Sequence, residues 1–350
     1  MRALALTAHG GPEVVKLLDL PEPTLQPGGA LVRVKAVALN HLDLWVRAGW
    51  SNLKLTFPHV QASDVAGVVE RVADPSTALR PGGSAVKPGD RVLVQPFVSC
   101  GKCPQCAAGR ENLCRQFHVR AEGVPGGAAD LVAVPVDELT VLPDALSFEQ
   151  AAAMSLTFLT SWHMLSARAQ VAAGEWVLVH AAGSGVGSAA IQLARHLGAH
   201  VIATAGDDAK LARAKALGAE HGINYRTQDF VAEVRRLTEK RGVDVVFDSV
   251  GGDTFERSLR AVHVGGRVVT CGATSAPMAT IDLRVLFLKQ LSLLGSTMGT
   301  RAELRELVRL AAAGAFHPVI DRVLPVERYE EGERALEDRA VFGKVVLTFD

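Results

Sequence analysis

Short apolar runs alternate with amphipathic segments throughout the second half of the chain. The segments at 188–198, 210–218 and 230–242 have the apolar spacing of helices, and glycine ends the first two. Strands that alternate with helices build βαβ units, which place their strands in a parallel sheet. The pattern therefore predicts a doubly wound α/β domain with a six-stranded parallel sheet. The expected strands lie at 176–180, 201–205, 223–225, 243–248, 267–272 and 291–296.

The first 145 residues have a different pattern, in which apolar and polar positions alternate with the period of strands. The segments 30–39, 64–73 and 91–97 are strand-like. Proline and glycine combine at 81–83 and 88–90, where proline presets φ and glycine accepts a positive φ, so turns are expected there. This part of the chain is predicted to be a β-rich domain.

Three segments connect these two regions or follow them. An alanine-rich, helix-compatible stretch at 150–172 leads into the sheet, and a helix at 301–314 and a strand at 344–349 follow it. Because no low-complexity linker intervenes, we expect the chain to leave the β-rich domain, build the sheet and return. The expected division is a β-rich domain at 1–157, a parallel-sheet domain at 158–298 and a return to the first domain at 299–350.

The charge balance excludes some classes of partner. The chain has 350 residues with 37 Lys+Arg and 37 Asp+Glu, so a nucleic acid or an anionic membrane has no net charge to attract it. The longest uncharged run, 176–194, has glycines in its middle and is interpreted as strand, turn and helix. The N-terminus lacks the apolar core of a signal peptide. We expect a cytoplasmic protein whose partner is a small molecule.

The turn AAGSGVG at 181–187 joins a predicted strand to a predicted helix. Free N–H groups and the helix dipole favour an anion there, and small residues let phosphates approach the backbone. The spacing departs from G-x-G-x-x-G, and a purely structural tight turn is the alternative. We expect the turn to bind the pyrophosphate of a nicotinamide dinucleotide. The residues concerned are Gly183, Ser184, Gly185, Val186 and Gly187.

The end of the second predicted sheet strand bears on the choice of cofactor. An acid at that place would bind the ribose 2′-hydroxyl of NAD, but this strand ends in Ala205-Gly206. Lys210 could pair with a 2′-phosphate, which favours NADP(H) over NAD(H). Asp207 and Asp208 argue for NAD(H), unless they cap the helix that follows.

Four of the five cysteines fall in one short segment, at 98–116. Four thiolates in one loop suit a closed, structural zinc site. The spacing and the residue after the last cysteine differ from the usual iron–sulfur pattern, and disulfides are disfavoured in a chain without an export signal. Cys271, at the end of a predicted strand, is interpreted as a small buried residue. The expected zinc ligands are Cys100, Cys103, Cys106 and Cys114.

Taken together, these features resemble the medium-chain dehydrogenase/reductase superfamily, which contains zinc alcohol dehydrogenases and quinone oxidoreductases. The four-cysteine lobe, the turn at 181–187, the segments 39–49 and 87–92 and the ending GKVVL carry the resemblance, which covers essentially the whole chain. It implies a GroES-like catalytic domain and a Rossmann domain with the active site in the cleft between them. It also implies hydride transfer between NAD(P)(H) and a small carbonyl, enone or quinone substrate, and a homodimer or homotetramer.

The chain departs from the family at the catalytic zinc. The resemblance places the three zinc ligands at Asn40, Ser63 and Leu156, and leucine cannot bind a metal. The hydroxyl and imidazole that relay the proton in the zinc enzymes correspond to Leu42 and Trp45. Because the metal ligands and the relay are absent together, we expect chemistry that needs no catalytic zinc.

Four polar residues remain near the expected zinc position: Asn40, Asp43, Ser63 and Asp64. We expect Asn40 to donate a hydrogen bond to the substrate oxygen, and Asp64 or Asp43 to handle protons through water. The alternative is that the two carboxylates only anchor loops by accepting backbone hydrogen bonds.

Two other functions stay open at this point. A rearranged metal site could use His41, His59, Asp43 and Asp64, which would restore a zinc-dependent alcohol dehydrogenase. A nucleotide-binding sensor without turnover would also tolerate the lost ligands.

The last predicted sheet strand, at 291–296, lies at a sheet edge that could pair with a second chain. Beyond the turn, the resemblance assigns cofactor contacts to His41, Thr160, Lys210, Tyr225, Val250, Gly272 and Ala273.

Overall fold

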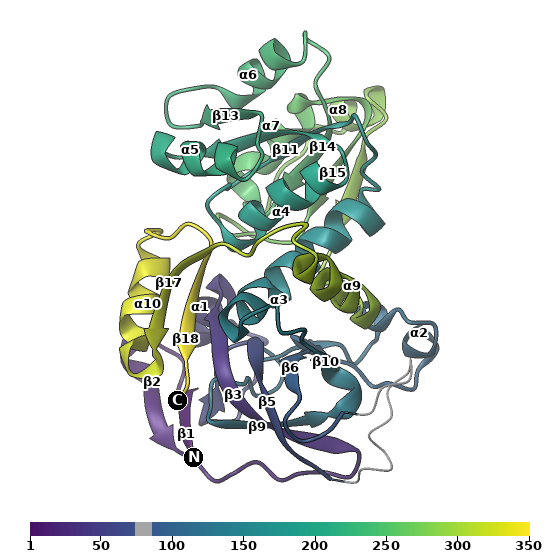
Figure 1. Ribbon diagram of the computed structural model, residues 1–350. Helices are drawn as coiled ribbons and strands as arrows, with labels where there is room; N and C mark the ends of the chain where they lie inside the picture. The colour runs from purple at the N-terminus through teal and green to yellow at the C-terminus, as the bar shows by residue number, and fades with distance from the viewer. Residues whose placement is uncertain (74–85) are drawn as a thin grey trace. The chain divides into compact units, whose positions relative to one another are not determined.

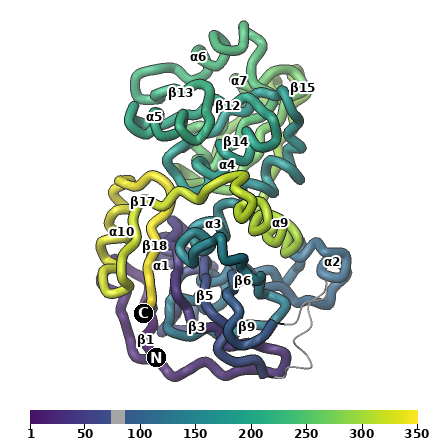
Figure 2. The backbone as a smooth tube through the Cα atoms, in the orientation of Figure 1, coloured from purple at the N-terminus to yellow at the C-terminus, as the bar shows by residue number. Residues whose placement is uncertain are grey.

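The computed structural model describes residues 1–73 and 86–350, so the turn expected at 81–83 lies outside the described residues. The chain forms two compact units. The first contains Met1–Leu156 and Thr300–Asp350, and the second contains Thr157–Gly299. Figures 1 and 2 show the purple N-terminal segment and the yellow C-terminal segment together in the first unit.

The largest sheet of the first unit joins strands from both ends of the chain. Its strands follow the order β10-β6-β5-β3-β18-β17, and β9 also pairs with β3. Antiparallel pairing of β18 with β3 sets Val345 opposite Leu39, which returns the C-terminus to the N-terminal domain. These strands are β3 (Gly29–Leu39), β5 (Asp64–Val72), β6 (Arg91–Val94), β9 (Leu131–Pro135), β10 (Leu139–Val141), β17 (Ile320–Pro325) and β18 (Lys344–Thr348).

Two smaller sheets complete the β structure described in this unit. The strand expected at 91–97 is divided, because Pro96 has no N–H group to donate to a ladder, and β6 ends before it. The smaller sheets contain β1 (Arg2–Leu6), β2 (Val15–Asp19) and β4 (His59–Val60), and β7 (Phe97–Val98) with β8 (His118–Val119).

The helices of the first unit pack on these sheets or border the cysteine segment. Helix α9 buries Leu304, Leu307, Val308 and Ala311, the face that its apolar spacing indicates. Helix α3 crosses the division between the units and continues as a π-helical segment, His163–Arg168. The helices are α1 (His41–Ala48), α2 (Pro104–Ala107), α3 (Phe148–Trp162), α9 (Arg301–Ala312) and α10 (Tyr329–Glu337), with 3₁₀ turns at Pro12–Val14, Glu111–Leu113, Val136–Glu138 and Val326–Arg328.

The second unit is built on the predicted six-stranded parallel sheet, which is confirmed. Its order, β13-β12-β11-β14-β15-β16, is that of a Rossmann sheet, with the first strand in the middle. No helix in the described part of the chain has the length and apolar character needed to cross a membrane. The elements are β11 (Trp176–Val179), α4 (Gly185–His196), β12 (His200–Ala205), α5 (Asp208–Ala216), β13 (His221–Asn224), α6 (Phe230–Leu237), β14 (Val243–Asp248), α7 (Gly252–Ala261), β15 (Val262–Thr270), α8 (Leu283–Leu288) and β16 (Ser292–Gly295).

One helix is shorter than its pattern indicates. The segment 230–242 is helical only to Leu237, because Thr238 ends the helix. The Thr238 hydroxyl donates to the Val234 carbonyl at 2.7 Å and accepts from Gly242 N–H at 2.9 Å. Glu239 and Lys240 then take positive φ angles of 51° and 69°, which a helix cannot continue through.

Candidate functional site

The glycine-rich turn between β11 and α4 has the geometry of a phosphate-binding turn. Ser184 is the N-cap of α4, and its hydroxyl accepts from Gly187 N–H at 2.9 Å. A Cβ at Gly187 would lie 2.2 Å from the Ala181 carbonyl oxygen, so only glycine lets the helix begin this close to the strand. The turn residues Gly183, Gly185 and Val186 are partly exposed, which leaves the helix N-terminus open to an anion.

A second turn at the same edge of the sheet follows β14. The Asp248 carboxylate accepts from Val250 N–H at 2.8 Å and Gly251 N–H at 3.0 Å. The segment after β15 lies against this turn, because Ser275 N–H donates to the Val250 carbonyl at 2.8 Å. A Cβ at Gly272 would lie 2.9 Å from the Ser249 carbonyl oxygen. These contacts bring Val250, Gly272 and Ala273 together at one end of the sheet.

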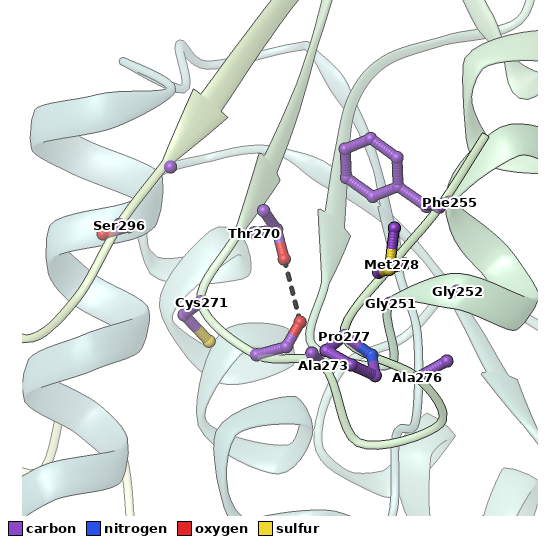
Figure 3. Close-up of a pocket in the computed structure, with 13 residues that line it drawn as sticks. Gly251, Gly252, Phe255, Thr270, Cys271, Ala273, Ala276, Pro277, Met278 and Ser296 are labelled. Carbon is purple, nitrogen blue, oxygen red and sulfur yellow. Dashed lines mark hydrogen bonds between the residues drawn. The ribbon is translucent and has the colours of Figure 1, made fainter. Parts of the chain in front are cut away.

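A pocket of about 400 Å³ opens between these two segments (Figure 3). Small residues and the Cys271 thiol form part of its walls, and the larger side chains of Phe255, Pro277 and Met278 line it as well. Burial raises the pKa of the Cys271 thiol to about 12, which keeps the group neutral. Thr270 donates to the Gly272 carbonyl at 3.2 Å, the bond drawn in Figure 3.

Strand β12 ends at Ala205 without an acidic residue. The next residue, Gly206, has no side chain. A Cβ at Gly206 would lie 2.8 Å from the Tyr225 hydroxyl and 3.2 Å from Arg226 Nε. Asp207 caps α5 by accepting from Lys210 N–H at 2.8 Å, and Asp208 accepts from Asn224 at 2.9 Å. Sequence reasoning missed Arg226, although a basic residue directly after Tyr225 was the available signal.

The two remaining cofactor candidates lie on helices. Thr160 is buried in α3, and His41 is the first residue of α1. Burial lowers the pKa of His41, so the imidazole is biased toward its neutral form. Its ring centroid lies 6.4 Å from that of Trp45, one helical turn along α1.

The four clustered cysteines have the geometry of a tetrahedral metal site. Their sulfur atoms all lie within 4.8 Å of one another, and four of the Sγ–Sγ distances are 3.5, 3.6, 3.8 and 3.9 Å. A tetrahedron with zinc–sulfur bonds of about 2.3 Å has edges of about 3.8 Å. All five cysteines are free thiols, so the disulfide alternative is not formed.

Backbone N–H groups donate to sulfur atoms of the cluster, whereas burial raises the pKa of the Cys106 thiol to about 11. Hydrogen bonds from the backbone N–H groups of Lys102 and Cys103 lower the pKa of Cys100 to about 6. Gln116 N–H donates to Cys114 Sγ at 3.3 Å. Because a metal is bound by thiolates rather than thiols, these donors fit a zinc ion.

Residues at two of the three expected ligand positions, Asn40 and Leu156, donate to one buried carboxylate. Asp64 accepts from Leu156 N–H at 2.8 Å through Oδ1, and from Asn40 Nδ2 at 2.9 Å through Oδ2. Lys344 Nζ donates to the same Oδ2 at 2.9 Å and also to Asn40 Oδ1. Asp64 is fully buried, and Lys344 is only 4% exposed. Sequence reasoning did not assign Lys344 a role, although a single charge opening an apolar terminal strand was a visible signal.

The other polar candidates hold the backbone. Asp43 accepts from Asn40 N–H at 2.8 Å and Ala62 N–H at 3.1 Å, and burial raises its pKa to about 6. The Ser63 hydroxyl donates to the Arg120 carbonyl at 2.7 Å. Asp43 and Asp64 are therefore buried and engaged, which is the geometry of loop anchors. Proton exchange with a substrate through water does not fit this geometry.

A rearranged metal site is not assembled either. His59 is buried, with its Nε2 3.0 Å from the Ala121 carbonyl oxygen, and Asp43 is occupied by backbone donors. Among residues 1–73 and 86–350, the four thiols are the one set of three or more His, Cys, Asp or Glu side chains close enough to share an ion.

Behind this cluster, a buried ion pair joins α1 to α10. Arg47 Nη1 lies 3.2 Å from the Glu333 carboxylate, and both side chains are buried. Burial raises the pKa of Glu333 from 4.5 to about 7. Folding raises the pKa of this carboxyl group, so the folded protein holds the proton more tightly than the unfolded chain does. The resulting contribution to stability is complete at a pH below the pKa in the unfolded chain, and it is lost as the pH rises through the pKa in the folded protein.

We therefore expect Glu333→Gln to change the pH dependence of stability. From pH 4.5 to 7.5 the unfolding free energy of the wild type should fall by about 3 kcal/mol relative to that of the variant. Urea unfolding at both pH values measures this difference. Glu331→Gln, on the exposed part of α10, is the control, and an equal pH response in both variants would contradict the assignment.

Comparison with known proteins places the chain in a family. Residues 26–144 match the alcohol dehydrogenase GroES-like domain, and residues 185–313 match the zinc-binding dehydrogenase domain. The quinone oxidoreductase of Rattus norvegicus is 30% identical over 356 residues, covering 99% of this chain and 97% of that protein. The chain belongs to the medium-chain dehydrogenase/reductase superfamily. Like other members, it is an NAD(P)-dependent oxidoreductase that acts on small molecules.

Solved structures of the superfamily share the whole fold. A structure titled NAD-dependent alcohol dehydrogenase is 47% identical, with a TM-score of 0.94 and complete coverage of both chains. A cobalt- and zinc-bound thermostable alcohol dehydrogenase from Pyrobaculum aerophilum is 31% identical, with a TM-score of 0.87, over 100% of this chain and 99% of that one.

Proposed function

We propose that this dehydrogenase transfers hydride to a conjugated carbonyl substrate, an enone or a quinone, without a catalytic zinc. The observation that carries the proposal is the composition of the three expected ligand positions. They hold an amide, a hydroxyl and a leucine, and none of the three side chains is a zinc ligand of the usual kind. Asn40 and Leu156 contact the buried Asp64, which pairs with Lys344, and the Ser63 hydroxyl donates to the Arg120 carbonyl.

The substrate class follows from where charge develops during reduction. Hydride transfer to a plain ketone concentrates negative charge on one oxygen, which calls for a metal or a strong acid. A conjugated system spreads the charge, so a hydrogen-bond donor suffices. When bound, the reduced nicotinamide supplies the hydride, and a proton from water completes the two-electron reduction.

Asn40 is the proposed donor to the substrate oxygen. One of its two amide hydrogens is directed to Asp64, and the other faces the Ala38 carbonyl oxygen at 3.4 Å, which is long for a hydrogen bond. Asn40 is also 9% exposed, whereas Asp64 is fully buried. The second hydrogen makes the longer of the two hydrogen bonds, so a substrate oxygen that reaches it would compete only with the Ala38 carbonyl.

Zinc counting combined with a substrate panel tests the proposed function. We expect one zinc per chain, held by the cysteine lobe, and NAD(P)H oxidation with enones or quinones that a chelator of exposed zinc does not slow. Two zinc ions per chain with chelator-sensitive oxidation of simple alcohols would instead support an alcohol dehydrogenase. The names of the solved relatives make that the second candidate.

The proposed cofactor is NADP(H). The end of β12 carries no acid. Tyr225 and Arg226, which follow β13, lie against Gly206, and Lys210 lies on the next helix, α5. A phosphate accepts hydrogen bonds from guanidinium and ammonium groups, whereas the 2′-hydroxyl of NAD gains little from them.

We expect Arg226→Ala to weaken NADPH binding by about tenfold or more and to change NADH binding by less than about twofold, because only NADPH loses a charge-assisted contact. Fluorescence titration with both cofactors measures the two affinities. Lys215→Ala, an exposed basic residue of α5, is the matched control and should alter neither. Equal losses for both cofactors with Arg226→Ala would refute a phosphate contact.

A homodimer is proposed from the edge of the parallel sheet. Strand β16 is an edge strand, and the neighbouring helix α8 exposes Leu283, Phe287 and Leu288, which are 63%, 63% and 70% exposed. A second copy of the chain would cover this apolar surface. Light scattering should give twice the chain mass of 37.0 kDa or a higher multiple.

A further inference from the structure

Lys344 is an unusual residue for its place in the fold. It opens β18, whose next residues Val345 and Val346 are fully buried, and it is itself 4% exposed. Taking an ammonium ion out of water is costly, and the cost is offset only by close partners. The two partners are the carboxylate of Asp64 at 2.9 Å and the side-chain oxygen of Asn40.

This arrangement determines the orientation of the Asn40 amide. An asparagine amide can rotate by half a turn with almost no change in shape, so packing alone does not distinguish its oxygen from its nitrogen. Lysine can only donate, and an ionised carboxylate can only accept. The oxygen of Asn40 must therefore face Lys344, and its nitrogen must face Asp64. The flipped amide would set oxygen against the carboxylate and NH₂ against the ammonium.

We propose that Lys344 is a positioning residue which, with Asp64, holds the Asn40 amide as the donor to the substrate oxygen. This inference rests on the proposed function of Asn40. With the amide orientation set, the direction of its second hydrogen is also set. The ammonium group on the amide oxygen polarises the amide, which strengthens its N–H groups as donors. The pair of Lys344 and Asp64 adds no net charge to the site.

A double-mutant cycle tests the coupling. The neutral background is Lys344→Met with Asp64→Asn, which keeps the side-chain volumes and removes both buried charges together. In the wild type, Asn40→Ala should lower kcat/KM by about a hundredfold, the usual effect of losing one oriented donor. In the neutral background the same change should cost less than about threefold, because the amide is no longer held. Equal factors in the two backgrounds would overturn the proposal.

Stability and cofactor binding separate this role from a structural one. Replacing a buried ion pair by neutral groups of similar volume is often neutral or stabilising, so the neutral background should unfold at the same temperature as the wild type or higher. Its kcat should still fall, with the KM for NADPH unchanged. Loss of activity that tracks loss of folded protein would contradict the positioning role.

Lys344→Arg keeps the experiment decisive if the neutral background does not fold. Arginine retains the positive charge and only donates, so it should preserve at least a third of kcat, whereas Lys344→Gln can reverse the amide and should lose most of it. Equal kcat values for the two variants would overturn the proposal.

Turnover of enones or quinones by the wild type tests the proposed function alone, and the double-mutant cycle can be measured on any carbonyl that the enzyme reduces.

Discussion

Cys103→Ser should reduce the zinc content from one ion per chain to nearly none. The four sulfur atoms form a closed set with edges close to those of a zinc tetrahedron, and a serine hydroxyl is a poor replacement for a thiolate. Metal binding of this kind contributes directly to folding. We therefore expect the melting temperature to fall by about 5–15 °C. Elemental analysis and thermal unfolding measure the two quantities.

Cys271→Ser is the matched control, because Cys271 is the fifth cysteine and lies in the other unit, at the end of β15. It should keep the full zinc content and a melting temperature within about 3 °C of the wild type. Chelation of the wild type should reproduce the effect of Cys103→Ser. A Cys103→Ser protein with full zinc content, or a metal-free wild type of unchanged stability, would rule out a structural zinc in the lobe.

Gly187→Ala should weaken cofactor binding by about ten- to a hundredfold. The added methyl would lie 2.2 Å from the Ala181 carbonyl oxygen, and backbone at this distance cannot be displaced cheaply. The start of α4 would have to move away from β11, and the N–H groups that meet the pyrophosphate would move with it. A ten- to a hundredfold loss of affinity corresponds to about 1.4–2.8 kcal/mol of binding free energy. Titration with NADPH measures it.

Gly222→Ala is the matched control in the same sheet. A Cβ at Gly222 would meet only atoms of the Leu211 side chain, at 3.1 Å or more, and that side chain can adjust. Cofactor affinity should therefore change by less than about twofold. Ser184→Ala should have an intermediate effect on cofactor affinity. It removes the hydroxyl that accepts from Gly187 N–H, and it adds no volume to the turn. Undiminished NADPH binding by Gly187→Ala would show that the turn does not hold the pyrophosphate.

The structure changes the roles of the polar residues around the expected zinc position. Asp43 and Asp64 accept hydrogen bonds from backbone and side-chain donors, and Asn40, whose second amide hydrogen makes only a long bond to the Ala38 carbonyl, is the proposed donor to a substrate. Lys344 is buried and donates to the Asn40 side-chain oxygen, which makes it the proposed positioning residue. The buried ion pair of Asp64 and Lys344 contacts Asn40, one of the three positions at which the resemblance to the family places a zinc ligand.

The sequence by itself determined the features that depend on neighbouring residues. The alternation of strands and helices predicted the six-stranded sheet, because hydrophobic periodicity is a property of short windows. The spacing of Cys100, Cys103, Cys106 and Cys114 predicted a metal lobe, since one short loop brings all four sulfurs together. The glycine-rich turn at 181–187 could be predicted for the same reason, because its strand, glycines and helix are consecutive in the sequence.

Only the tertiary structure decided which distant residues meet. Lys344 reaches Asp64 and Asn40 across 280 and 304 residues of chain, because β18 pairs with β3 beside the strand that begins at Asp64. Arg226 lies beside Gly206 because β13 pairs with β12. The sequence pattern specifies that each strand exists, whereas strand order and register specify what each side chain contacts. Hydrogen-bond partners of buried polar groups depend on that register, and so the catalytic assignments had to wait for the fold.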